Sequence, residues 1–172
     1  LGIGFITVEL VLMQKFVLLL GHPTYSMAVV LSSLLFFSGV GSLATKRLEF
    51  SRHRIVIITL MIFISIFLYI LISEIVISKL IYASLATRVV ISATIAAIPA
   101  FFMGMLFPFG IKLTEKLSKG LIPWMWGING ITSTLGGVAS MIISLLFGFN
   151  VALLIGILMY LLGAVAIIKI KI

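Results

Sequence analysis

The chain has 172 residues, of which 63% are hydrophobic and only 9% are charged, and its mean hydropathy is +1.41. Soluble domains carry about 25% charged residues, so this composition excludes an ordinary soluble domain. The absence of cysteine excludes disulfides, thiolate metal sites and cysteine nucleophiles. The net charge of +8 does not indicate a nucleic-acid partner, because the basic residues lie between apolar segments, where they set membrane topology.

The apolar segments are continuous and close to twenty residues long, which is the length that an α-helix needs to cross a bilayer. A β-barrel would instead need alternating strands of about ten residues. The sequence therefore predicts an all-α integral membrane bundle of six helices, forming one domain over residues 1–172. The predicted spans are about 2–20, 24–44, 54–73, 88–112, 123–147 and 151–168. A weaker amphipathic segment, 75–87, predicts a helix lying at the membrane interface.

The basic residues predict the orientation of this bundle. Two of them, Lys79 and Arg88, fall on one side, and Lys15 falls inside the first span. The nine on the other side are Lys46, Arg47, Arg52, Arg54, Lys112, Lys116, Lys119, Lys169 and Lys171. The positive-inside rule places these nine in the cytoplasm, so both termini are expected there. The first span is too long for a cleavable signal and has no basic leader.

The first span carries three polar residues in its interior, Glu9, Gln14 and Lys15. A charge near the bilayer centre costs at least about 2.5 kcal/mol, so such a residue is a functional-site candidate by default. Glu9 is the acidic residue of an otherwise apolar segment, and three roles stay open for it. It can be a neutral, hydrogen-bonded residue that packs two helices, a cation- or proton-binding group, or a lipid-facing side chain. We expect Lys15 to reach the headgroups instead, since long basic side chains extend toward the interface.

The fifth span contains a face of small and hydroxyl-bearing residues, with Trp126 at its start and Ser144 at its end. Its other members are Gly130, Ser133, Gly137 and Ser140. Small residues let helix backbones approach closely, so this seam predicts helix packing, with a substrate-lining face as the alternative. Asn129 is the strongest polar group beside it. Asn129 and Glu9 lie at similar distances from the starts of their helices, so we expect the two side chains to meet.

The fourth span contains Pro99 and Pro108. Interior prolines free carbonyls and kink helices, so a kink is predicted at both positions. Discontinuous helices often mark binding sites in transporters, and a static kink satisfied by a neighbouring helix is the alternative.

Several kinds of site are not predicted. The sequence contains no phosphate-binding glycine loop and no histidine pair with metal-ligand spacing, so we expect no metal and no cofactor. Glu9, Lys15 and His22 have no spacing that indicates a mechanism, so no catalytic residue is predicted. A soluble catalytic domain is not present in these residues.

Three strings resemble the carboxy-terminal membrane region of prokaryotic spermidine-synthase-like membrane proteins. They are E-L-x-L-x-Q-K-F from Glu9, L-G-H-P from Leu20 and P-W-x-W-G-I-N-G from Pro123. The stretch G-M-L-F-P-F-G-I-K-L from Gly104 resembles the same region. Glu9, Gln14, His22, Pro108 and Asn129 match this membrane motif. In that family a membrane portion similar to the major facilitator transporters is joined to a soluble domain like the aminopropyltransferases, whose catalytic residues have no counterpart here. The resemblance implies a prokaryotic inner membrane and a link to polyamines.

Two functions are therefore expected as alternatives. The first is transporter-like handling of a small substrate, cationic and of the polyamine type, with Glu9, Gln14 and Asn129 as the binding or proton-carrying residues. Six helices resemble half of a major facilitator bundle, so a second half, a fused soluble domain or a larger complex is expected as partner. The alternative is a structural anchor or accessory subunit that docks through the seam on the fifth span. In both, the lipid bilayer is the surrounding partner.

Overall fold

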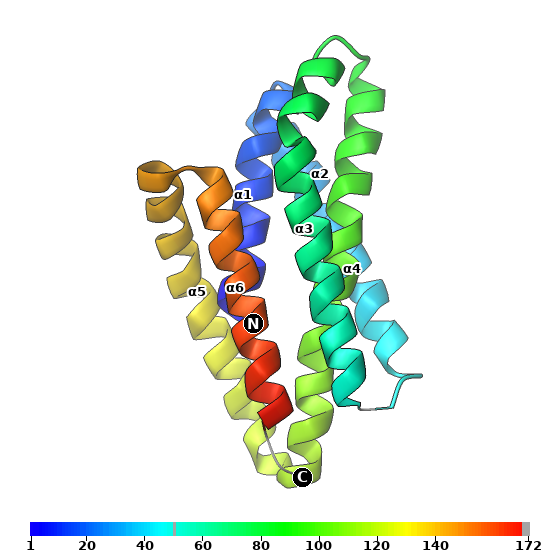
Figure 1. Ribbon diagram of the computed structural model, residues 1–172, viewed down its shortest axis with the longest axis vertical. Coiled ribbons are helices and arrows are strands. Elements are labelled where there is room, and N and C mark those ends of the chain that lie inside the picture. The colour runs from blue at the N-terminus through cyan, green and yellow to red at the C-terminus, as the bar shows by residue number, and fades with distance from the viewer. Residues whose placement is uncertain (50, 170–172) are drawn as a thin grey trace.

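The computed structural model describes residues 1–49 and 51–169, and this part of the chain is almost entirely helical. The elements are α1 (Gly2–Leu20), α2 (Pro23–Thr45), α3 (Arg52–Leu80), α4 (Leu85–Leu117), the 3-10 helix η1 (Lys119–Leu121), α5 (Ile122–Phe147) and α6 (Phe149–Lys169) (Figure 1). The six α-helices are long and apolar enough to cross a membrane. This confirms the all-α class and indicates an integral membrane protein. Lys171, counted above for the topology, lies outside the described residues.

The turns after α1 and α5 form for local reasons. Gly21 has φ of 79° and Gly148 has φ of 88°, a backbone region that residues with a side chain rarely adopt. His22 then begins α2 as its N-cap, because its imidazole Nδ1 accepts a hydrogen bond from the Thr24 amide at 3.2 Å. Pro23 follows at the first helical position, where its missing amide proton costs nothing. These two turns define what we call the turn end of the bundle.

The third and fourth helices are longer than the sequence predicts. With 29 and 33 residues they extend about 43 and 50 Å, well beyond the roughly 30 Å of the hydrocarbon region. In Figure 1 they stand above the other helices at the turn end. The interfacial helix expected over 75–87 does not form as a separate element. Its first part continues α3 and its last part begins α4, since no helix breaker separates it from either span.

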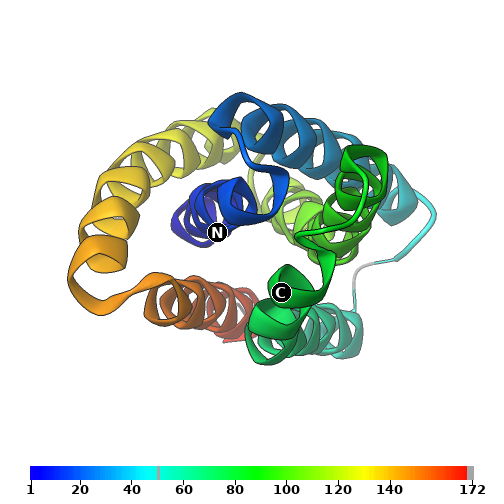
Figure 2. The same ribbon diagram turned by 90° about the horizontal axis from the view of Figure 1, so that it is seen from above.

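The first helix lies inside the bundle, and it contacts each of the other five α-helices. Seen from above, α5, α6, α3, α4 and α2 surround it (Figure 2). By contrast α2 and α5 flank α1 on either side and make no contact with each other in the described part of the chain. The α1 face between them is therefore only partly covered by the described chain, and we call it the open face.

The helices form two units of three that pack in the same pattern. The first helix of each unit packs on the second of the other, α1 on α5 and α4 on α2. The first helix of each unit also packs on the third helix of the other, α1 on α6 and α4 on α3. Because successive helices alternate in direction, α4–α6 repeats α1–α3 with the opposite orientation (Figure 1). An inverted pair of this kind could not be read from the sequence, in which the two units share no visible repeat.

Glycine permits the closest of these contacts. A Cβ added at Gly41 of α2 would collide with the Phe101 carbonyl of α4, and one added at Gly104 of α4 would collide with the Ser38 backbone. Small residues bring helix backbones together where the surrounding lipid offers no hydrophobic driving force. This crossing fixes α2 against α4 in the part of the bundle where α2 ends. We call that side the basic end, because Lys46 and Lys112 lie there.

Candidate functional site: a cavity at the basic end and two charged residues of α1

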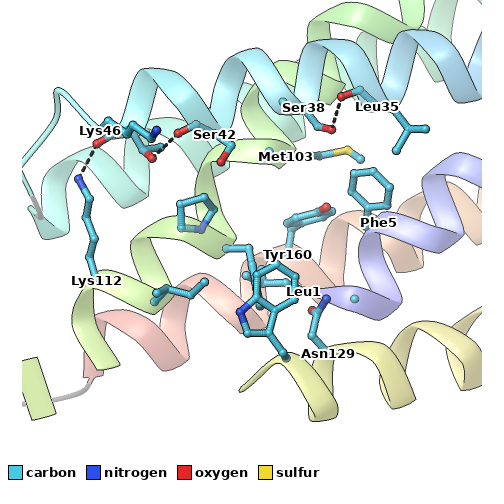
Figure 3. A pocket seen from close by; sticks show the side chains of 18 of the residues that line it. Leu1, Phe5, Leu35, Ser38, Ser42, Lys46, Met103, Lys112, Asn129 and Tyr160 are labelled. Atoms are coloured by element: carbon cyan, nitrogen blue, oxygen red, sulfur yellow. Dashed lines mark hydrogen bonds between the residues drawn. The ribbon is translucent and has the colours of Figure 1, made fainter. Parts of the chain in front are cut away.

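A cavity of about 730 Å³ opens at the basic end (Figure 3). It lies between α1, α2, α4 and α5, and Tyr160 of α6 lies among its lining residues. Its volume falls within the 300–1,000 Å³ typical of ligand pockets. Of the predicted site residues, Asn129 and Pro108 line it, whereas Glu9 and Gln14 do not. The cavity could not be predicted from the sequence, because its wall combines residues from five helices.

Small side chains keep this cavity open. Gly39 of α2 lines it, and a Cβ added at Gly39 would meet no atom within 4 Å. Gly104 lines the same wall, where its missing side chain also lets α2 approach. Across the cavity, the Trp126 ring packs edge-on against Phe107 with ring centroids 4.7 Å apart. On the α2 side, the cavity therefore has unfilled space at Gly39. On the opposite side, its wall is formed by the aromatic pair of α4 and α5.

The mouth of the cavity carries the charges. Lys46, Lys112 and Glu115 line both the cavity and a second hollow of about 640 Å³ directly beside it. That hollow adds four more residues, which are Arg47, Leu48, Glu49 and Lys116. Four basic and two acidic residues give the mouth an excess of positive charge.

Besides lining the cavity mouth, Lys112 connects α4 to the end of α2. Its Nζ donates a hydrogen bond to the Thr45 carbonyl at 2.5 Å (Figure 3). It donates a second one to the Leu48 carbonyl at 2.8 Å, just beyond the end of α2. A basic side chain is well suited to the free carbonyls at a helix C-terminus. The same ammonium lies 5.8 Å from the Phe109 ring centroid. Lys112 therefore holds α2 against α4 and places its positive charge at the cavity mouth.

Glu9 is half-buried in α1, and its carboxyl has no hydrogen-bond partner among the described residues. At 100° per residue, Glu9 shares a face of α1 with Gly2 and Phe5, both of which line the cavity. It lies about 6 Å farther along the helix than Phe5, beyond the cavity itself. Residues of α1 that meet α5 include Gly2, Ile3 and Ile6, so the face that Glu9 shares with Gly2 borders the contact with α5. Glu9 is thus a carboxyl without a partner, and it lies on the open face.

The expected meeting of Glu9 with Asn129 does not occur. The Asn129 carbonyl lies beside Gly2, which is seven residues, or about 10 Å, below Glu9 along α1. No hydrogen bond joins the two side chains in the part of the chain that the structure describes. The prediction was wrong because it assumed that α1 and α5 begin at the same depth in the membrane. In the structure the beginning of α1 lies beside Asn129, the eighth residue of α5.

Gln14 and the two prolines have separate places. The Gln14 Nε2 lies 3.5 Å from the Met141 sulfur, so this side chain joins α1 to α5. Pro108 lines the cavity, whereas Pro99 is buried against a smaller hollow of about 200 Å³ beside α3. The helix α4 continues through both prolines. A kink at Pro99 and Pro108 stays a prediction.

Part of the predicted seam on α5 is used inside the chain, and its closest glycine contact with α1 is at Gly136, next to the predicted Gly137. A Cβ added at Gly136 would lie 2.8 Å from the Ile3 Cα, so Gly136 lets α5 approach the backbone of α1 closely. Gly137 makes ordinary contact with Ile6, and Gly130 meets no atom within 4 Å. Ser133 lies beside Gly2, and Ser140 is buried. Sequence spacing alone could not distinguish adjacent glycines on one helix face.

The expectation that Lys15 reaches the headgroups is wrong. Its side chain is only 7% exposed, and its Nζ donates to the Ser73 hydroxyl of α3 at 2.9 Å and to the Asn150 carbonyl oxygen of α6 at 2.7 Å. The ammonium also lies 5.2 Å from the centroid of the Tyr69 ring. Lys15 thus connects α1, α3 and α6 near the turn end. A lysine in an apolar span was the available signal, but its acceptors belong to helices far away in the sequence.

Among residues 1–49 and 51–169, no group of three histidine, aspartate or glutamate side chains could hold a metal ion. No family model, no curated protein and no solved structure matches this chain. The site must therefore be interpreted from its own chemistry.

Proposed function

We propose that this chain is a transporter-like membrane domain in which Glu9 binds a proton or a small cation. The observation that carries the proposal is a half-buried carboxyl, in the interior of an apolar helix, with no hydrogen-bond partner in the described chain. A carboxyl in such a position is costly, so it is expected to face a partner or a pathway. It contrasts with the exposed carboxylates at the cavity mouth, which water can reach.

The arrangement of helices supports this proposal. Two units of inverted orientation occur in many transporters, whose substrate and ion sites lie near the bilayer midplane at an interface between repeats. Glu9 lies near the middle of α1, on the open face between α2 and α5. We propose that a second six-helix half covers this face, supplied by the same parent chain or by a second copy. Glu9 would then lie between the two halves.

The substrate class is narrower than the resemblance to spermidine-synthase-like proteins implies. A polyamine carries several positive charges, and Glu9 offers one carboxyl. The cavity mouth at the basic end carries an excess of positive charge, which opposes the approach of a polycation from that side. Within the proposal, a proton or a singly charged cation is the better ligand of Glu9.

By the positive-inside rule the basic end, and with it both termini, faces the cytoplasm of a prokaryotic inner membrane.

The test is Glu9→Gln in reconstituted vesicles that contain a pH-sensitive dye, with spermidine, a monovalent amine or a proton gradient applied in separate assays. We expect flux to fall at least tenfold, because an amide can neither carry the proton nor neutralise a cation. Glu49→Gln is the matched control, since that carboxylate lies at the basic end outside the spans, and it should keep flux unchanged. Equal flux in the Glu9→Gln variant and the unmodified protein would refute the proposal.

A structural anchor is the second candidate, and one observation favours it. Only three residues of α5, Gly136, Ser140 and Ser144, are buried in the chain, so most of this helix is available to a partner helix. A protein that carries no flux under any of the three conditions, but migrates in native gels as part of a larger complex, would support this alternative.

A further inference from the structure

We propose that the cavity at the basic end binds an anionic phospholipid of the adjoining leaflet, with the headgroup at Lys46 and one acyl chain inside the cavity. The proposal concerns the cavity and does not involve Glu9, so it goes beyond the function proposed above. It rests on three features of the described residues, which are the apolar interior, the length of the cavity and the position of the positive charges.

The interior of the cavity is suited to a hydrocarbon chain. Phe5, Leu35, Met103 and Phe107 line it, and they present apolar side chains from α1, α2 and α4 (Figure 3). The polar groups of the deeper wall are few, and the Ser38 hydroxyl donates to the Leu35 carbonyl of its own helix at 3.3 Å. A charged or strongly hydrated ligand would therefore lose its hydration in this interior without gaining partners.

The length of the cavity matches one leaflet of a bilayer. Leu35 and Lys46 both line it and lie eleven residues apart on α2, which corresponds to about 16 Å. The hydrocarbon region of a bilayer is about 30 Å thick, so one leaflet contributes about 15 Å. A cavity that begins at the basic end and extends this far follows an acyl chain from its headgroup to the midplane.

The positive charges lie where the headgroup would be. Lys46 is exposed at the end of α2, and its side chain makes no hydrogen bond or ion pair with any described residue. Lys112 donates two of its three ammonium protons to carbonyls, which leaves one for a ligand. Arg47 borders the same mouth. Basic pockets between membrane helices on the cytoplasmic side bind anionic lipid headgroups, and a single phosphodiester suits this arrangement.

Trp126 provides a direct probe, because it lines the cavity and Trp124 is the only other tryptophan of the chain. Trp124→Phe leaves Trp126 as the single tryptophan. The purified protein is placed in phosphatidylcholine nanodiscs. A small fraction of the lipid carries brominated acyl chains and is either phosphatidylglycerol or phosphatidylcholine. Quenching of Trp126 fluorescence then measures which lipid occupies the cavity.

We expect brominated phosphatidylglycerol to quench Trp126 at lower mole fraction than brominated phosphatidylcholine. One basic residue near a membrane surface changes the affinity for an anionic lipid by about fivefold. Lys46→Gln should therefore reduce the preference for phosphatidylglycerol about fivefold. Lys119→Gln is the matched control, because Lys119 belongs to the basic end but lines neither the cavity nor the hollow beside it. Equal quenching by the two lipids, or an unchanged preference in Lys46→Gln, would overturn the proposal.

A second pair of variants separates the cavity from lipid that merely surrounds the helices. Gly39→Phe places a ring into the cavity from a position whose Cβ meets no atom within 4 Å, so the fold is kept. Gly130→Phe adds the same ring at an equally open position of α5 that does not line the cavity. We expect the phosphatidylglycerol preference to disappear in Gly39→Phe and to persist in Gly130→Phe. Quenching that is identical in both variants would show that Trp126 senses only surrounding lipid, which contradicts the proposal.

The source of the anion is tested with brominated oleate and with inorganic phosphate. Oleate added to the nanodiscs should compete only weakly with phosphatidylglycerol for the cavity. Inorganic phosphate should not displace phosphatidylglycerol, because phosphate lacks an acyl chain. Lys46-dependent quenching by oleate but not by phosphatidylglycerol would overturn the assignment to a phospholipid.

Discussion

Lys15 and Glu9 are two ionisable residues of the same helix, about 9 Å apart along its axis, and the structure treats them in opposite ways. The Lys15 ammonium is buried and has acceptors from α3 and α6. The Glu9 carboxyl is half-buried and has no hydrogen-bond partner in the described chain. The difference teaches that a charge inside an apolar segment does not define its own role. The role depends on whether neighbouring helices bring polar atoms to it.

The largest effect on stability is expected for Ser73→Ala. Ser73 is fully buried, so its loss leaves the Lys15 ammonium with one acceptor fewer where water cannot replace it. A hydrogen bond to a charged group contributes about 1.5–3 kcal/mol, so we expect the free energy of unfolding in detergent to fall by about 2 kcal/mol. Ser78→Ala on the exposed side of α3 is the control, because the Ser78 hydroxyl, like that of Ser73, donates to a carbonyl of its own helix but does not bond to Lys15. A similar loss of unfolding free energy in Ser73→Ala and Ser78→Ala would mean that the bond from Lys15 to Ser73 does not stabilise the fold.

A smaller loss, about 1 kcal/mol, is expected for Asn150→Ala. Its bond to Lys15 is shorter, at 2.7 Å, but Asn150 is exposed, so water or a headgroup can replace the lost oxygen. The measurement is a double-mutant cycle with Lys15→Met, in which the ammonium is absent and Asn150→Ala should have almost no effect. If the two changes are additive, the contact between α1 and α6 does not depend on this bond.

The smallest change in stability is expected for Glu9→Gln. Because no described residue hydrogen-bonds to Glu9, the exchange should alter the free energy of unfolding by less than about 0.5 kcal/mol. The same unfolding assay measures it beside Ser73→Ala. A loss comparable to that of Ser73→Ala would show that Glu9 has a structural partner, which would remove the contrast with Lys15.

The sequence by itself determined the class of fold and most of the helix limits. The first span was predicted at 2–20 and α1 is Gly2–Leu20, because an apolar run followed by Gly21 and Pro23 has a local beginning and end. The fifth span was predicted at 123–147 and α5 is Ile122–Phe147 for the same kind of reason. The limits failed over 75–87, where no breaker was present, and at the end of the fourth span, which was predicted at 112 and lies at Leu117 in α4. Periodicity alone does not end a helix.

The tertiary structure alone decided where the polar residues of these helices lie. Hydropathy fixes which segments are apolar, but it does not fix how far one helix is shifted along another. That shift places Asn129 beside Gly2 and away from Glu9, and it brings Asn150 to Lys15. The cavity arose in the same way, because five helices contribute to its wall and Gly39 leaves it unfilled. Contacts between distant segments depend on packing of whole helices, and no short stretch of the chain contains that information.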